Sequence, residues 1–182
     1  MLSSTTGIAA PRSVLNEGSE IVFRVKEMGV PIPGKFKRFE AMIDIDPAKP
    51  EKSNASLKID IGSLTTGNDE ADAIAVDTNW LDKVHAPYAV FKTKGIRLLA
   101  PSRYEAIGTL NIRNREVSMT LQFTTVDQAD GKTIVRSSFN IQRSDFGIGG
   151  GEWNEPGIVD QTIAVEVRLI LASSATTPTT AH

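Results

Sequence analysis

Cysteine is absent from the 182-residue chain, and histidine occurs only at His85 and His182. Without cysteine the chain has no disulfides, thiolate nucleophiles, zinc knuckles or cysteine-held iron–sulfur clusters, and two histidines argue against an imidazole-rich metal site. No apolar run approaches the roughly 20 residues that a helix needs to cross a bilayer. The 14 glycines and 9 prolines are too few for a low-complexity polymer. We therefore expect one globular domain.

The chain also has little excess of either charge, because its formal net charge is only -2. Proteins that bind nucleic acid carry a basic excess that neutralises phosphates, so we expect no nucleic-acid partner. Residues 1–12 lack the basic start and the long apolar stretch of a signal sequence. Two alternatives stay open: the protein is cytoplasmic, or its signal has been removed. Residues 173–182 are small and polar without periodicity and predict a flexible tail.

Apolar and polar residues alternate along most of the chain, which is typical of strands with one buried face. The alternating segments are 21–26, 39–45, 55–61, 89–94, 104–112, 117–123, 135–141 and 163–171. The apolar run 96–99 extends the fourth segment beyond Gly95 or adds a ninth strand. Turn-forming pairs such as Asn114-Arg115 and Asp130-Gly131 separate the segments. The spacing predicts antiparallel neighbours joined by short turns.

Residues 67–84 interrupt this alternation. Asn68 is suited to cap a first helical turn that carries Asp69, Glu70 and Asp72. Apolar residues then recur at helical spacing up to Val84. The segment predicts one helix or two short ones between the third and fourth strands.

Eight strands with one apolar face each can bury that face between two sheets or inside a closed barrel. Closure also removes exposed strand edges. The inward-facing set mixes aromatic rings with small residues such as Ala41, Ala55 and Gly108, so a barrel could keep a lumen. The residues alone leave open whether that lumen is filled or hollow.

Catalytic patterns are weak in this sequence. A nucleophilic triad at His85 would need Ser63, Ser102 or Ser144, but the chain has no Gly-x-Ser-x-Gly elbow. Residues 145–147 (DFG) match a kinase tripeptide without its partner motifs. The acidic residues at 69, 70, 72 and 77 do not follow the spacing of a calcium loop. We expect no catalytic residue, no metal ligand and no catalytic cofactor.

Seven short motifs in order resemble those of the YceI-like proteins. They are residues 21–31 (IVFRVKEMGVP), 34–39 (GKFKRF), 59–68 (IDIGSLTTGN), 80–82 (WLD), 87–91 (PYAVF), 143–149 (RSDFGIG) and 158–160 (IVD). The resemblance implies an all-β, eight-stranded antiparallel lipocalin-like barrel, with a short helical insertion near residues 68–84. The barrel domain is expected over residues 20–172, after a partly disordered N-terminal segment at 1–19 and before the tail at 173–182.

The resemblance also implies a ligand. The resemblance implies an apolar lumen that holds a long isoprenoid lipid, such as a polyprenyl chain or an isoprenoid quinone tail, or a similar long amphiphilic lipid. It also implies export to the periplasm and a transport role. The expected ligand-binding residues are the inward set, together with Ile74, Trp80 and Leu81 as a lid. The inward set is Phe23, Val25, Phe39, Ile43, Leu57, Ile59, Phe91, Leu110, Leu121 and Phe139.

Several positions depart from the family pattern. Glu27 stands where a histidine is common, Ala71 replaces an arginine, Ile74-Ala75 replace a His-Leu pair, and Asn114 replaces a glycine. The first three changes remove polar or charged groups around the insertion, so the contact to a ligand headgroup is left unassigned. Arg143 and Asp145 flank a turn, where we expect an ion pair or hydrogen bonds to backbone at one barrel end.

Two other functions remain as alternatives. An enzyme acting on isoprenoid lipids would need polar groups inside the lumen, where the pattern offers only Ser137, Thr93 and Tyr104. An interaction module or accessory protein for a membrane redox system, with a filled barrel, would need an outer apolar patch; the family resemblance points to a b-type cytochrome as its partner. A homodimer through the same patch is a further alternative. The patch would consist of Val22, Met42, Val90, Ile107 and Ile134.

Overall fold

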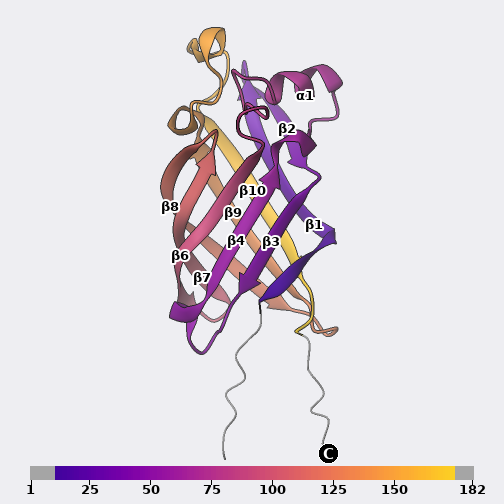
Figure 1. The fold of residues 1–182 in the computed structure, drawn as a ribbon, viewed down its shortest axis with the longest axis vertical. Helices are drawn as coiled ribbons and strands as arrows, with labels where there is room; N and C mark the ends of the chain where they lie inside the picture. The colour runs from indigo at the N-terminus through magenta and orange to yellow at the C-terminus, as the bar shows by residue number, and fades with distance from the viewer. Residues whose placement is uncertain (1–10, 175–182) are drawn as a thin grey trace, which may run out of the picture.

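The computed structural model describes residues 11–174, and its strands form one sheet that closes into a barrel (Figure 1). The strands are β1 (Arg12–Glu27), β2 (Val30–Phe36), β3 (Phe39–Asp44), β4 (Asn54–Asp60), β5 (Leu64–Thr65), β6 (Tyr88–Ala100), β7 (Arg103–Ile112), β8 (Arg115–Asp127), β9 (Thr133–Gln142) and β10 (Thr162–Leu171). The helices are α1 (Asp69–Ala75) and four short 3-10 turns at Pro50–Lys52, Ile61–Ser63, Arg143–Phe146 and Gly151–Asn154.

Eight of the strands make the closed wall. The order is β10-β9-β8-β7-β6-β4-β3-β1, and β1 pairs again with β10. All of these pairs are antiparallel, and the register places Phe23 opposite Val165 and Val165 opposite Phe139. Phe23, Val165 and Phe139 therefore lie side by side across three neighbouring strands. The prediction of an all-β, eight-stranded antiparallel barrel is confirmed.

Strand β1 begins at Arg12, whereas the predicted barrel domain begins at residue 20. The Arg12 guanidinium donates hydrogen bonds to the carbonyl of Ala172 and the hydroxyl of Thr133, which fix this strand to the opposite end of the chain. A register shift between Leu15 and Glu20 interrupts the alternation that the prediction used. The rest of the predicted N-terminal segment, 1–10, and most of the predicted tail, 175–182, lie outside the described residues.

Strand β2 was not predicted, because Pro31 and Pro33 lack the N–H groups expected of a strand. It pairs with β1 along one side and with β5 only at Lys35 and Phe36, so it tolerates prolines as an edge strand does. Gly34 is required here, because a Cβ at this position would lie 2.2 Å from the Phe23 ring. The β1–β2 hairpin extends the wall above the barrel.

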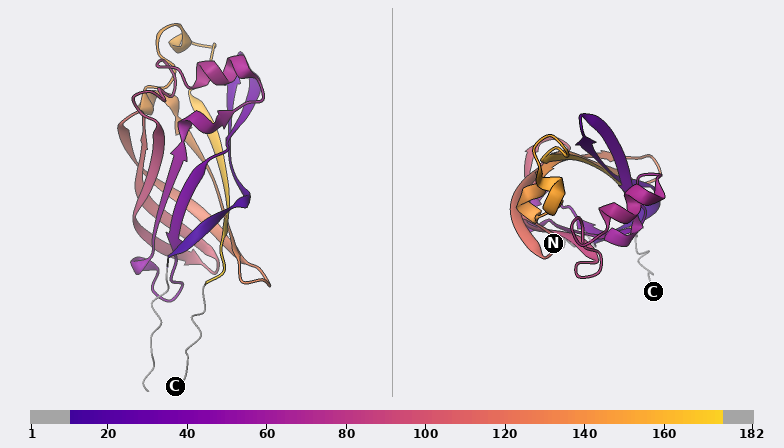
Figure 2. Two further views of the ribbon diagram at one scale, coloured as in Figure 1. Left: turned by 45° about the vertical axis from the view of Figure 1, so that its right-hand side comes forward. Right: turned by 90° about the horizontal axis from the view of Figure 1, so that it is seen from above.

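The helical insertion lies at one end of the barrel. As predicted, the Asn68 side chain caps α1 by accepting hydrogen bonds from the amides of Glu70 and Ala71. Seen from above, α1 lies on one side of the barrel end and the 3-10 turn Gly151–Asn154 on the other (Figure 2). The run 96–99 extends β6, past a register shift between Thr93 and Gly95. The described part of the chain contains no helix long and apolar enough to cross a membrane.

Candidate functional site

The barrel encloses a hollow of two chambers. The upper chamber, beneath α1, has a volume of about 220 Å³, and the lower chamber has about 110 Å³. Five residues line both chambers and so form a waist between them: Ile21, Ile59, Leu110, Phe139 and Val165. The chambers therefore lie end to end along the barrel. The lumen that the sequence left open as filled or hollow contains free space.

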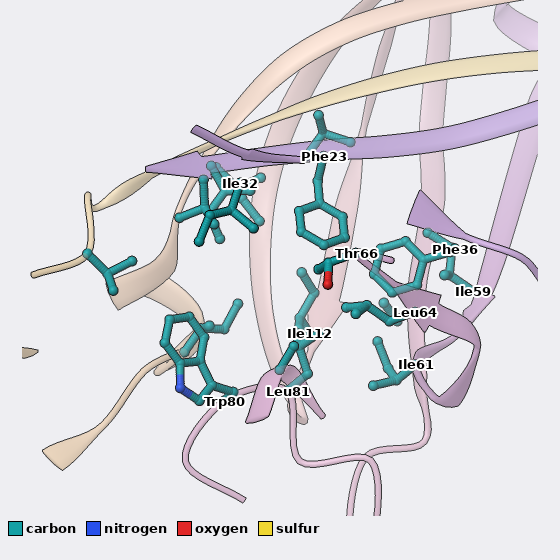
Figure 3. Close-up of a pocket in the computed structure, with 18 of the residues that line it drawn as sticks. Phe23, Ile32, Phe36, Ile59, Ile61, Leu64, Thr66, Trp80, Leu81 and Ile112 are labelled. Carbon is teal, nitrogen blue, oxygen red and sulfur yellow. The ribbon is translucent and has the colours of Figure 1, made fainter. Parts of the chain in front are cut away.

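The upper chamber is covered by two segments from different parts of the chain, and Trp80 and Leu81 of the first segment are labelled in Figure 3. The lid, which we define as residues 66–81, contributes Ala71, Ile74 and Ala75 from α1 together with Trp80 and Leu81. The strap, which we define as residues 147–159, contributes Ile148, Trp153 and Val159. The Trp80 and Trp153 rings meet edge to face at 5.5 Å between centroids. Lid and strap thus contact each other over the mouth of the hollow.

The lower chamber ends on a packed floor. Tyr104 and Phe123 stack with ring centroids 5.1 Å apart and an interplanar angle of 13°. Ile96 and Ala106 pack beside them and are 3% and 4% exposed. Because protein interiors are packed as densely as organic crystals, this cluster closes the hollow at the end opposite the lid.

The lining of the hollow is almost entirely apolar. In the upper chamber, Glu27 and Thr66 are the polar residues, and in the lower chamber they are Ser56, Thr93 and Ser137. Thr93 and Ser137 donate their hydroxyls to backbone carbonyls of Ala55 and Gln122, at 3.1 and 2.7 Å.

Tyr104, the third polar group considered for catalysis, lies in the floor and lines neither chamber. The Thr93 and Ser137 hydroxyls thus donate to two different backbone carbonyls, and Tyr104 does not reach the chamber.

The residues predicted to bind ligand are largely brought together by the fold. Phe23, Val25, Ile74, Trp80 and Leu81 line the upper chamber; Ile43, Leu57, Phe91 and Leu121 line the lower chamber; Ile59, Leu110 and Phe139 line both. Phe39, at the first position of β3, lines neither chamber and packs in the buried cluster that contains Ile21 and Ala41. Their role as ligand contacts stays a prediction.

Among the lining residues that sequence reasoning missed, two groups come from segments in which no strand was predicted. Ile32 and Phe36 come from β2, where two prolines concealed a period-two pattern. Ile148, Trp153 and Val159 come from the strap, which has no periodicity. The motifs at 143–149 and 158–160 bracket the strap and were its one available signal.

The lid is held at its first turn by Asp72. Its carboxylate accepts hydrogen bonds from the Thr66 amide at 2.5 Å and the Thr66 hydroxyl at 2.7 Å. Burial raises the pKa of Asp72, but the hydrogen bonds from Thr66 outweigh burial and lower that pKa below its usual value. None of the α1 side chains is fully buried, so this latch and the Asn68 cap carry much of the attachment of the helix.

The strap is held by Arg143, which is 1% exposed. Its guanidinium donates to the carbonyls of Ile148, Gly149, Trp153, Val159 and Asp160 at 2.8 to 3.1 Å. Burial lowers the pKa of this guanidinium. Of the two contacts expected for Arg143, the structure shows the hydrogen bonds to backbone, and they close the strap into a compact loop.

Comparisons with known proteins agree with this architecture. The model of the YceI-like domain family matches residues 13–171. The chain belongs to the YceI-like family. A UPF0312 protein of Pseudomonas putida is 26% identical over 177 residues, which cover 92% of this chain and 88% of the relative.

Two solved structures of similar shape illustrate the fold of this YceI-like chain. Burkholderia cenocepacia BcnA is 28% identical, with a TM-score of 0.83, and the match covers 87% of this chain and 99% of BcnA. A domain from Saccharophagus degradans, described as polyisoprenoid binding and implicated in plant cell wall breakdown, is 15% identical. Its TM-score is 0.69, with 89% of this chain and 98% of that domain covered, and it supports the fold alone.

Proposed function

We propose that this YceI-like chain binds an isoprenoid lipid, a polyprenyl chain or the tail of an isoprenoid quinone, inside the barrel and carries it. The observation on which the proposal depends is the two-chamber hollow, because its lining is hydrocarbon except for five polar residues. The description of the Saccharophagus domain as polyisoprenoid binding is consistent with this ligand class.

The energetics favour a hydrocarbon chain. Burial contributes about 0.8 kcal/mol per methylene, or roughly 4 kcal/mol for a five-carbon prenyl unit. Immobilising the ligand costs several kcal/mol, so one unit gives little net affinity and further units give most of it. Since the walls offer few free hydrogen-bonding groups, shape and length decide which ligand binds.

We further propose that binding involves no catalysis. Two of the lumen hydroxyls, those of Thr93 and Ser137, are hydrogen-bonded to backbone carbonyls. A reaction on the lipid would need a polar group free to approach it. Assaying bound lipid before and after prolonged incubation with the protein tests this: an unchanged lipid mass is expected, and a new product would overturn it.

A periplasmic location and delivery to a b-type cytochrome are proposals supported by the family resemblance. A homodimer through an outer apolar patch is a further proposal. The outer residues considered for an interaction patch are interleaved with polar ones. Val90 lies opposite Lys58 and Asn111, and Val22 lies opposite Lys35 and Glu166. Fractionation of cells expressing the full gene tests the location. Measurement of the molar mass in solution by light scattering tests the dimer.

Extraction and mass spectrometry of the purified protein test the lipid proposal directly. We expect recovery of an isoprenoid lipid, or uptake of ubiquinone analogues at one per chain. Val165→Phe, which narrows the waist, should reduce uptake at least tenfold, whereas Ala164→Phe places the same ring on the outer face of β10 and should not. Failure to recover lipid together with failure to take up the analogues would refute the function.

A further inference from the structure

The two chambers set a limit on the tail that the hollow can hold. Together they provide about 330 Å³. A buried apolar cavity of about 150 Å³ holds one benzene, which is roughly 25 Å³ per carbon atom. The same ratio gives about 13 carbons for this hollow, between two and three prenyl units.

The length of the hollow gives a similar limit. Strand β7 lines it from Ile112 down to Ala106, and β9 lines it from Ile141 down to Val135. Six residue steps of about 3.3 Å, on strands tilted by about 40°, span roughly 15 Å along the barrel axis. An extended prenyl unit adds four carbon–carbon bonds of about 1.5 Å, or roughly 5 Å. Three units therefore reach from the lid to the floor.

The hollow has one closed end. The Tyr104–Phe123 stack and Ile96 block the lower chamber, and these residues belong to a buried cluster. At the other end the covering is lighter, since no α1 residue is fully buried and Gly67 has a φ of +85° before the helix. A tail must therefore be inserted from the lidded end and cannot extend past the floor.

The polar groups lie where the other end of such a ligand would be. Glu27 and Thr66 line the upper chamber. The indole N–H of Trp80 is buried and finds no acceptor within residues 11–174. A buried donor without a partner is costly, and an oxygen at the head of the ligand can accept from it.

We propose that the hollow holds a single tail of about three prenyl units, inserted methyl end first to the Tyr104–Phe123 floor, with its oxygen-bearing end under Trp80. This inference rests on the proposed function and adds a length limit to it. Units beyond the third stay outside the hollow and add little affinity, so longer polyprenyl lipids are held only by their terminal segment.

Competition among prenyl alcohols tests the limit on the full chain after delipidation. Native mass spectrometry of the protein with equimolar pairs of two-, three-, four- and eight-unit alcohols reports their relative affinities. We expect about tenfold or greater preference for three units over two, and less than about threefold preference for any longer alcohol over three. Continued tenfold gains beyond four units, or equal binding of two and three units, would overturn the length limit while leaving isoprenoid binding intact. Failure of every alcohol to bind would instead count against the proposed function.

A variant tests whether the end of the tail occupies the lower chamber. Ala55 lines that chamber, and Ala55→Leu adds three carbons to it, so the preferred alcohol should shorten to two units. Thr120→Leu adds a similar side chain on the exposed face of β8 and should leave the preference at three. An unchanged preference in folded Ala55→Leu protein would contradict the placement. The wild-type series remains decisive if that variant does not fold.

Discussion

Replacing Arg143 by methionine removes the donor that holds the strap over the upper chamber. Five backbone carbonyls lose their partner at once, and each lies 2.8 to 3.1 Å from the guanidinium. A hydrogen bond from a charged group contributes about 1.5 to 3 kcal/mol, but these contributions are not additive and the buried cation itself carries a desolvation cost. We therefore expect a net loss of about 4 kcal/mol in the free energy of unfolding.

Thermal and urea unfolding measure this loss. For a domain of this size each kcal/mol shifts the melting temperature by about 2 to 4 °C, so Arg143→Met should melt about 8 to 16 °C lower. Arg143→Lys keeps the charge but has only three donors, so its melting temperature should lie between those of the wild type and Arg143→Met. Arg136→Met removes an exposed arginine from β9 and should change stability by less than about 0.5 kcal/mol.

A loss below about 1 kcal/mol for Arg143→Met would refute this reasoning, because it would mean that the strap carbonyls find other partners when the guanidinium is removed. A second readout separates local from global effects. If the strap opens while the barrel persists, hydrogen exchange should increase at residues 147–159 and stay unchanged in β7 and β8. Lipid uptake should decrease with it, since Trp153 and Val159 line the upper chamber.

Three further outcomes are expected. Farnesyl diphosphate should bind about tenfold or more weakly than farnesol, because Glu27 is the one charged residue among the described lining residues, and Glu27→Gln should narrow the difference; equal binding of the two ligands would contradict this. Hydrogen-exchange protection of α1 should stay constant from about pH 8 to 5 and decline below about pH 4, because the pKa of Asp72 is lower in the folded protein than in the unfolded chain. The Asp72 carboxylate therefore stabilises the lid at pH values above its unfolded-state pKa, and this stabilisation is lost as the carboxylate is protonated. Asp72→Asn should show reduced protection at neutral pH, and an unchanged pH profile in that variant would exclude the latch. Gly34→Ala should cost about 1 to 3 kcal/mol in urea unfolding through its clash with Phe23, whereas Gly95→Ala, which has open space around it, should cost less than about 1 kcal/mol.

The fold follows from the sequence wherever side chains alternate strictly. Residues such as Ile43, Leu57 and Leu121 could be assigned to the inner face, because a strand has a period of two and one face had to be buried. Asn68 predicted the start of α1 for a local reason, since its side chain satisfies the free amides of the first turn. Each of these inferences needs only neighbours along the chain.

The rest of the site depends on contacts between distant segments. Whether the lumen is hollow depends on how closely side chains from eight strands meet, and no single strand contains that information. Phe39 alternates correctly with its neighbours, yet it packs in a buried cluster with Ile21 and Ala41 and lines neither chamber, and its own strand does not reveal this. The sequence likewise left open whether Arg143 forms an ion pair or hydrogen bonds to backbone, since the strap carbonyls that it holds have no sequence signature.

The distribution of hydrogen bonds indicates where a lipid can pass. The wall is a closed ladder of paired strands, and opening it would break many backbone hydrogen bonds at once. The floor is a packed aromatic cluster. The lid, by contrast, is held at its start by the Asn68 cap and the Thr66–Asp72 latch, and at its far end by the hydrogen bonds that the Gly149 and Gly150 amides donate to the Asn79 carbonyl. Local opening follows the segments with the fewest buried contacts, so exchange of a bound tail should proceed through the lid while the barrel stays intact, and the rate of exchange should depend on Asp72 more than on any wall residue.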